Sequence, residues 1–327
     1  MTRRKFVILL GAAAVAWPLR VSAQQSALPV IGFLNNATPE SYAPFVAAFR
    51  NGLRQVGFVE GQNVSIQFRW GRNLSMQLPG LAAELVRIPV SVMVASGGDQ
   101  AVQAAKEAST AIPIVATIGN DPVDSGLVAS LNRPGGNITG VSVFAVQLVA
   151  KRLQMARELV PDGGTISFLT NPTNPNGAID RAELAEAAST LGQQVAILEA
   201  AGADECDAAF ARLAAKGGGV LIVESDPYFN GIVDRLVTLA KRHSIAVIYP
   251  RREFAIAGGL MSYGTSLTEA YRQIGIYVGR ILKGDKPSEL PILLPTRFEL
   301  VVNLRAAQAL GLTMPTAILL RADEVIE

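Results

Sequence analysis

The chain has very few of the side chains that metal centres and nucleophilic active sites depend on. Its 327 residues include one histidine, His243, and one cysteine, Cys206. A single imidazole and a single thiol almost exclude cysteine/histidine zinc sites and histidine-dependent catalytic triads. A lone cysteine also excludes an internal disulfide, so the fold must rest on its hydrophobic core. We therefore expect no metal, no cofactor and no catalytic residue, and carboxylate-only chemistry is the remaining catalytic alternative.

Both rare residues lie in places that favour structural roles. Cys206 falls in the helical pattern GADECDAAFARLAAK, where a buried small thiol is more usual than a nucleophile. His243 falls in LAKRHSIAV at the expected end of a helix, where it would meet the helix dipole or solvent rather than act as a base.

Charged and aromatic residues are also scarce, at 17% and 6% of a chain that is half hydrophobic. This balance is typical of a folded globular protein, and the length allows two domains. The formal net charge is +2, from 29 basic and 27 acidic residues. Four of the basic residues lie within residues 1–23, and without them 25 basic residues would face 27 acidic ones. Since no clustered basic face remains, we expect no nucleic-acid partner.

One apolar run stands near the N-terminus, from Phe6 to Trp17, after the basic start MTRRK and before the small-residue exit Val21–Ala23. This order predicts an export signal at residues 1–23, cleaved after Ala23. The run is shorter than the roughly 20 residues of a membrane-spanning helix, although a permanent anchor remains an alternative. The paired arginines fit a twin-arginine signal and a general secretory signal equally. We therefore expect a periplasmic protein.

From Pro29 onward, short β-branched runs alternate with Ala/Leu-rich helical stretches, which is typical of parallel sheets covered on both faces. One such series fills residues 29–143 and a second fills 144–263. The chain has no long Pro/Ser-rich linker, so short hinge strands should join the two lobes. The predicted strands are 29–34, 63–70, 90–96, 112–118, 137–143, 165–170, 194–200, 219–225, 245–249 and 297–303. The predicted helices are 43–56, 81–87, 100–109, 122–131, 145–159, 178–191, 204–215, 230–242 and 267–284.

Ligands of open parallel sheets bind beyond the carboxyl ends of the strands, so the loops there are the places to search. In the first series these loops contain Asn36, Ser96-Gly97-Gly98 and Asn120-Asp121. Ser-Gly-Gly offers a hydroxyl and closely approached backbone N–H groups to a carboxylate, or it is a plain glycine turn with a serine N-cap. Asp121 before Pro122 is well explained as a helix N-cap. No phosphate loop or dinucleotide fingerprint is present.

In the second series the corresponding loops contain Asn171, Glu224, Asp226 and Arg251. Asp226 would face the cleft and receive an ammonium group, or it would simply cap a helix ahead of Pro227. Arg251 would hold a ligand carboxylate, or it would belong to an exposed charged turn.

Four segments carry a resemblance to a known family over essentially the whole chain after the signal. They are DPVDSGLVASLNRPGGNITGVS (121–142), GGLMSYG (258–264), YVGRILKGDKPSELPILLPTRFELVVN (277–303) and ALGLTMPTAILLRADEVIE (309–327). The chain resembles the exported ABC-transporter substrate-binding proteins that include the tryptophan/tyrosine-type binding proteins. This resemblance implies an α/β type I periplasmic-binding fold, in which two Rossmann-like lobes with parallel sheets are joined by a three-crossing hinge. Lobe 1 would comprise 27–142 plus 266–297, and lobe 2 would comprise 143–263 plus 298–327.

The resemblance also implies a ligand enclosed between the lobes. It places Tyr263 at the mouth of the cleft, where the ring would face a ligand unless it is a core tyrosine under the hinge. By position, Ser96, Gly97 and Asn120 match the carboxylate-binding role, and Asp226 or Glu224 matches the amine-binding role. The expected ligand-binding residues are Asn36, Ser96, Gly97, Asn120, Asp121, Asn171, Glu224, Asp226, Arg251 and Tyr263.

The function implied is that of a monomeric periplasmic receptor of an ABC importer, with a membrane permease and a separate ATPase as partners. Its small-molecule ligand would be an aromatic or branched amino acid, or else an organic acid held by Arg251. A receptor of the same fold that reports its ligand to a membrane sensor is a further alternative.

Overall fold

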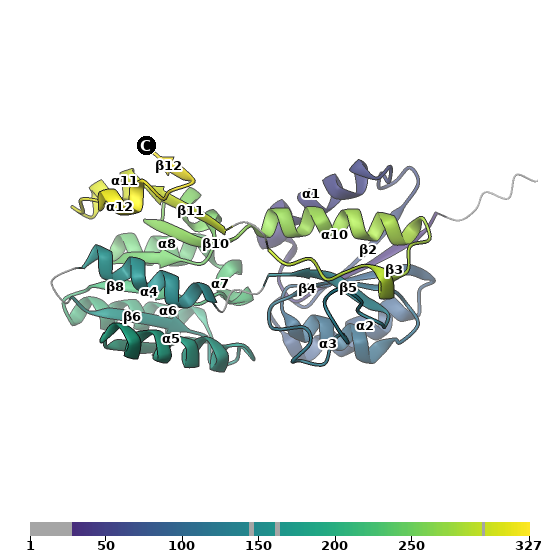
Figure 1. Cartoon of the computed structure of the whole chain (residues 1–327), viewed down its shortest axis with the longest axis horizontal. Helices are drawn as coiled ribbons and strands as arrows, with labels where there is room; N and C mark the ends of the chain where they lie inside the picture. The colour runs from purple at the N-terminus through teal and green to yellow at the C-terminus, as the bar shows by residue number, and fades with distance from the viewer. Residues whose placement is uncertain (1–27, 144–146, 161–163, 296–297) are drawn as a thin grey trace, which may run out of the picture.

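A computed structural model describes residues 28–143, 147–160, 164–295 and 298–327, which form two lobes side by side (Figure 1). The predicted export signal lies outside these residues. No helix within the described ranges is both long and apolar enough to cross a membrane.

Lobe 1 is a five-stranded parallel sheet in the order β2-β1-β3-β4-β5. Helices α1 and α10 cover one face, and α2 and α3 cover the other (Figure 1). Side chains alternate between the two faces as a pleated strand requires, so that Phe33 packs under α1 and α10 while Leu34 packs under α2 and α3. The strands are β1 Val30–Asn35, β2 Ser65–Trp70, β3 Val90–Ser96, β4 Ile114–Ile118 and β5 Ile138–Ser142; the helices are α1 Pro39–Gln55, α2 Leu78–Val86, α3 Asp99–Ala108 and α10 Leu267–Leu282.

Lobe 2 is a seven-stranded sheet in the order β12-β11-β10-β9-β8-β6-β7, in which only the β10–β11 pairing among those described is antiparallel. Two apolar clusters fill its two faces. The strands are β6 Ile166–Thr170, β7 Val195–Glu199, β8 Val220–Val223, β9 Ala246–Tyr249, β10 Met261–Thr265, β11 Phe298–Asn303 and β12 Glu324–Ile326. The helices are α4 Gln147–Leu159, α5 Gly177–Leu191, α6 Ala203–Ala215, α7 Pro227–Gly231, α8 Val233–Arg242, α9 Arg252–Ile256, α11 Leu304–Ala309 and α12 Thr316–Leu319.

The chain passes between the two sheets three times. It leaves lobe 1 after β5, returns after β10 to form α10, and crosses again before β11 (Figure 1). The segment after α10 is fastened to lobe 1, because Leu293 N donates to Gly140 O at 3.0 Å and Ser142 N donates to Leu293 O at 2.8 Å. A long helix that is remote in sequence thereby completes the first lobe.

Helices α1 and α10 touch through glycine. A Cβ atom at Gly52 of α1 would overlap the carbonyl oxygen of Arg272, and one at Gly275 of α10 would overlap that of Phe49. The two backbones can therefore approach closely only because neither position carries a side chain.

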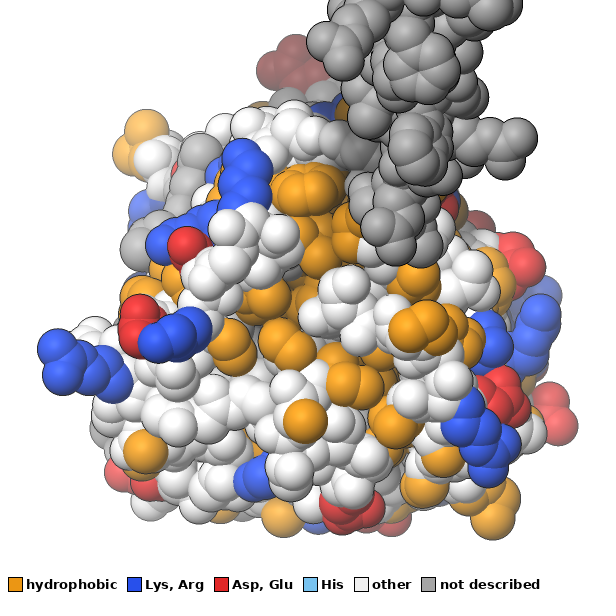
Figure 2. All heavy atoms as spheres, turned by 90° about the vertical axis from the view of Figure 1, so that its right-hand side faces the viewer, with side chains coloured by type: hydrophobic (Ala, Val, Ile, Leu, Met, Phe, Trp, Pro, Cys, Tyr) orange, Lys and Arg blue, Asp and Glu red, His pale blue; other side chains and the backbone are white. Residues whose placement is uncertain are grey.

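The outer end of lobe 1, which faces away from lobe 2, carries a group of hydrophobic side chains (Figure 2). Lysine and arginine side chains on this face stand among acidic ones rather than in a single basic field.

The predicted α/β class and the two-series pattern are confirmed, and most of the expected helices and strands are present. The helix predicted at 122–131 is wrong: this stretch forms turns, and Gly126 adopts a left-handed φ of 67° that ends the single turn beginning at Asp121. The helix predicted at 230–242 is divided at Ile232 into α7 and α8. The short elements α9, α11, α12 and β12 carry too few residues to give a periodic signal.

Candidate functional site

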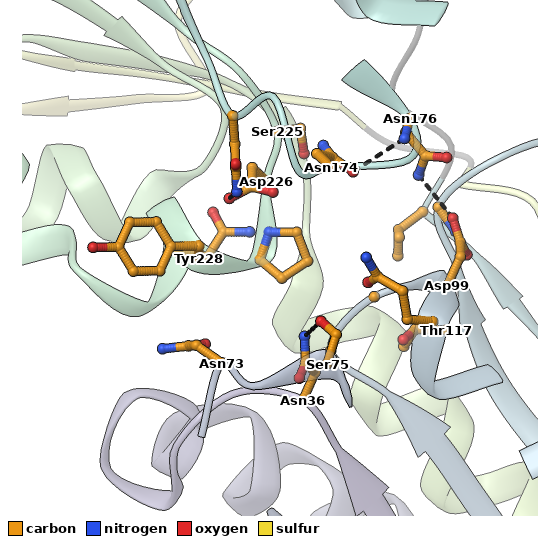
Figure 3. A pocket seen from close by; sticks show the side chains of 18 of the residues that line it. Asn36, Asn73, Ser75, Asp99, Thr117, Asn174, Asn176, Ser225, Asp226 and Tyr228 are labelled. Atoms are coloured by element: carbon orange, nitrogen blue, oxygen red, sulfur yellow. Dashed lines mark hydrogen bonds between the residues drawn. The ribbon is translucent and has the colours of Figure 1, made fainter. Parts of the chain in front are cut away.

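A polar cavity lies between the two lobes, where the carboxyl ends of both sheets face each other (Figure 3). Its lobe 1 wall includes Asn36, Gly97, Asp99 and Thr117, which follow or end strands β1, β3 and β4. Its lobe 2 wall includes Asn171, Asn176, Asp226 and Arg251, which follow strands β6, β8 and β9. Loops that are distant in sequence thus meet at one site because parallel strands end at the same edge.

The Ser-Gly-Gly turn opens the N-terminus of α3 toward this cavity. Gly97 and Gly98 have φ angles of 78° and 119°, a region that side chains disfavour, and a Cβ at Gly97 would collide with Oδ1 of Asn35. Gly98 is the N-cap residue, and no side chain caps the helix there. The first N–H groups of α3, with the positive end of its dipole, are therefore suited to a carboxylate.

Ser96 supports this turn from behind and is not among the residues that line the cavity. It is fully buried, and its Oγ accepts a hydrogen bond from Asn35 Nδ2 at 2.9 Å. The same amide donates to the hydroxyl of Tyr271 at 3.2 Å, while Asn35 Oδ1 accepts from Ala37 N at 2.7 Å. These bonds fix the ends of β1 and β3 against α10.

Asp226 both caps a helix and lines the cavity, so the helix cap does not exclude a position facing the cleft. It precedes Pro227, whose fixed φ favours the first helical position, and its Oδ1 accepts from Phe229 N at 3.1 Å. The amide of Asn171 donates to the same oxygen at 3.3 Å. Burial raises the pKa of Asp226 to about 6, because the charged carboxylate loses hydration.

Glu224 lies beneath the cavity wall and is not one of its lining residues. Its Oε2 accepts from Thr170 Oγ1 at 2.9 Å and from Asn171 N at 2.7 Å, and its Oε1 accepts from Asn174 Nδ2 at 3.0 Å. Burial, together with the neighbouring carboxylates of Asp226 and Asp180, raises its pKa to about 7. Glu224 therefore braces the loop after β6.

Arg251 is buried rather than part of an exposed turn, since only 7% of its surface is accessible. It lines the cavity, and its Nε and Nη1 have no hydrogen-bond partner among the described residues. A second buried guanidinium, Arg152, lies deeper in lobe 2 and donates from Nη1 to Val223 O at 2.8 Å. Burial lowers the pKa of Arg152 to about 10, and the carboxylate of Asp180 partly opposes this shift. Buried guanidinium N–H groups that lack an acceptor are costly, so Nε and Nη1 of Arg251 are suited to receive an anion.

Three further predicted residues lie outside the cavity lining. Asn120 lines a separate hollow with Gln103 and Ser125. Asp121 acts as a cap, because its Oδ1 accepts from Val123 N at 2.8 Å and Asp124 N at 3.0 Å. Tyr263 packs on the core of lobe 2, with its ring centroid 6.4 Å from that of Phe298, in agreement with the core-tyrosine alternative.

Several lining residues were not predicted from the sequence. Asp99 and Tyr228 are each two residues from a predicted site residue, so their positions next to these loops could have identified them as candidates from the sequence. Tyr42, Asn176 and Asp180 lie in helices or just before them, and only the apposition of the lobes brings them to the site. No group of three or more His, Cys, Asp or Glu side chains in the described part of the chain is arranged to hold a metal ion.

We expect the ligand-free protein to lose stability as the pH rises from about 5 to about 7.5. Burial raises the pKa values of Asp180, Glu224 and Asp226 to about 6, 7 and 6, whereas carboxyls in an unfolded chain titrate at about 4. Over this range the folded form holds protons that the unfolded chain has released, so stability falls with rising pH. Glutamine cannot ionise, so the Tm of Glu224→Gln should rise relative to that of wild type as the pH increases over this range. Calorimetry of both proteins tests this, and a Tm difference that does not change with pH would contradict it.

Comparison with known proteins agrees with this architecture. A family model described as ABC transporter substrate binding protein matches residues 37–326. A tyrosine-binding protein of Clostridioides difficile (strain R20291) is 25% identical over 264 residues, which cover 81% of this chain and 75% of the relative.

Solved structures with the same fold include the following two. A conserved domain protein from Vibrio cholerae superposes with a TM-score of 0.82 at 24% identity, covering 91% of this chain and 99% of that one. An ABC domain from Streptococcus pneumonia in complex with L-Trp superposes with a TM-score of 0.80 at 23% identity, covering 92% and 100%. Since the family match spans most of the sequence, this chain belongs to the ABC transporter substrate binding proteins, a family that binds ligands rather than catalysing reactions.

Proposed function

We propose that the protein is the solute receptor of an ABC importer and binds an aromatic amino acid between its lobes. The observation that carries this proposal is that one interlobe cavity is lined by a buried carboxyl, Asp226, and by a buried arginine, Arg251, whose Nε and Nη1 have no hydrogen-bond partner among the described residues. These two groups complement the ammonium and the carboxylate of an amino acid. The tyrosine-binding relative and the L-Trp complex support the aromatic class.

The other wall of the cavity suits the rest of such a ligand. The uncapped N-terminus of α3 at Gly97 and Gly98 offers further N–H groups to the carboxylate. Tyr228, from α7, supplies aromatic surface for an aromatic side chain, whereas Tyr42, from α1, borders the cavity but is almost fully buried in the core of lobe 1.

We expect ligand binding to close the two lobes. A ligand that contacts Gly97 in lobe 1 and Asp226 in lobe 2 makes both sets of contacts only when the lobes are close, so it shifts the hinge equilibrium toward the closed form. A membrane permease with a separate ATPase would then recognise the closed receptor. The export signal predicted at residues 1–23 supports a periplasmic location for this step.

A carboxylic acid without an amine is the second candidate ligand. It is favoured by Arg251, whose Nε and Nη1 can serve an anion whether or not an ammonium group is present.

We expect L-tyrosine and L-tryptophan to raise the Tm of the purified protein, because a ligand that binds only the folded form stabilises it. The matched comparison is 3-(4-hydroxyphenyl)propanoate, which keeps the ring and carboxylate of tyrosine but lacks the amine. A thermal-shift series followed by calorimetric titration should rank the amino acids well above this acid. The reverse ranking would favour the second candidate.

A further inference from the structure

A hydrogen bond between protein groups joins the two lobes inside the cavity. Asn176 Nδ2, in lobe 2, donates to Asp99 Oδ2, in lobe 1, at 2.7 Å (Figure 3). Asp99 is the first residue of α3, and Asn176 stands immediately before α5. The bond involves no ligand atom, and it can form only when the lobes are close.

Each partner is held in place for this contact. Asp99 Oδ1 accepts from Gly119 N at 2.8 Å, which fixes the carboxylate at the end of β4. Asn176 occupies the N-cap position of α5, yet its side chain makes no cap hydrogen bond and is directed toward Asp99 instead (Figure 3). Its backbone N–H donates to Asn174 Oδ1 at 3.1 Å.

The residues around Asp99 and Asn176 are closely packed. A Cβ at Gly119 would lie 3.1 Å from both Asn176 Nδ2 and Asp99 Oδ2. Close by, a Cβ at Gly98 in lobe 1 would lie 3.2 Å from the ring of Pro227 in lobe 2. The two lobes therefore meet tightly where α3 and α7 begin.

We propose that Asp99 and Asn176 form an interlobe latch that stabilises the closed receptor with or without ligand, and so sets affinity without distinguishing between ligands. The inference rests on the proposed function in that closure accompanies binding. Apparent affinity scales with the population of the binding-competent form, so a latch contributes the same factor for every ligand. A charge-assisted hydrogen bond in a partly buried place changes such an equilibrium by roughly tenfold or more.

The test uses Asn176→Asp, which places a second carboxylate opposite Asp99. We expect the ligand-free variant to be more open, with a larger radius of gyration in X-ray scattering than wild type. Its dissociation constants for L-tyrosine and L-tryptophan should rise by the same factor, roughly tenfold or more. Asn176→Ala removes the donor without adding charge and should act in the same direction by less. The double variant Asp99→Asn/Asn176→Asp exchanges donor and acceptor and should restore both readouts.

Asn137→Ala is the matched control, because that amide donates only within lobe 1, to Ser109 O at 3.0 Å and to Ile112 O at 2.8 Å, and does not line the cavity. It should leave the scattering of the ligand-free protein unchanged. The latch is overturned if Asn176→Asp scatters like wild type, or if the dissociation constants of the two amino acids change by different factors. It is also overturned if the exchanged pair restores neither readout, or if Asn137→Ala opens the lobes equally. If neither amino acid binds wild type, the proposed function fails. The scattering of the ligand-free wild type and variants still tests whether Asp99 and Asn176 hold the lobes together.

Discussion

Replacing Asp226 with asparagine should weaken the binding of L-tyrosine and L-tryptophan by roughly 100-fold or more, because the ammonium group loses its buried counter-charge. Asparagine is as good an N-cap as aspartate, and its side-chain oxygen can keep the bonds from Phe229 N and the Asn171 amide. The folded protein should therefore melt no lower than wild type near pH 7, where Asp226, with its pKa raised to about 6, is ionised at a cost to folded-state stability that the neutral amide avoids. Calorimetric titration and thermal melts of the same preparation separate the two effects.

The control for this variant is Asp121→Asn. Asp121 also accepts backbone N–H groups through Oδ1 in a turn, but it is not one of the residues that line the cavity. It should leave the dissociation constants of both amino acids unchanged. Wild-type affinity in Asp226→Asn, or an equal loss in both variants, would show that Asp226 does not receive the amine.

Gly52→Ala should destabilise the protein by about 3 kcal/mol or more, since the added methyl group overlaps the carbonyl oxygen of Arg272 where α1 crosses α10. The neighbour is backbone, so relief requires the two helices to separate and disturbs the apolar cluster between them and the sheet. We expect a fall in Tm of roughly 5–10 °C by calorimetry.

The same substitution at Gly80 is the matched control. Gly80 also lies in a helix, α2, but a Cβ there would have no atom within 4 Å. Alanine should leave the Tm unchanged or raise it slightly, because it favours helix more than glycine does. If Gly52→Ala melted as high as Gly80→Ala, the close crossing of α1 and α10 would not exist in solution.

Most of the fold was predictable because its signals are local. Runs such as Val90–Ser96 and helices such as Leu267–Leu282 carry their own hydrophobic pattern, so their type can be assigned without knowledge of the neighbours. The stretch 122–131 was not predictable in the same way. It has helical composition, but a left-handed glycine after one turn gives it a different path.

The candidate site was only partly predictable. Five residues predicted from loops at the carboxyl ends of strands line the cavity: Asn36, Gly97, Asn171, Asp226 and Arg251. The sequence could not show that Ser96 and Glu224 support the wall from behind, because both occupy the same kind of loop as the lining residues. Which side of a loop a side chain takes depends on the strands and helices packed beside it.

The sequence alone determined the α/β class, because this follows from the local hydrophobic periodicity. It also determined the family resemblance, from sequence motifs, and the improbability of histidine- or thiol-based chemistry, from residue counts. Tertiary structure alone decided that Arg251 is buried with Nε and Nη1 unpaired among the described residues, that Tyr263 packs against the core of lobe 2, and that Asn176 reaches Asp99 across the lobes. The physical reason is separation along the chain. Burial and hydrogen-bond partners are properties of groups that folding brings together, and Asp99 and Asn176 are 77 positions apart.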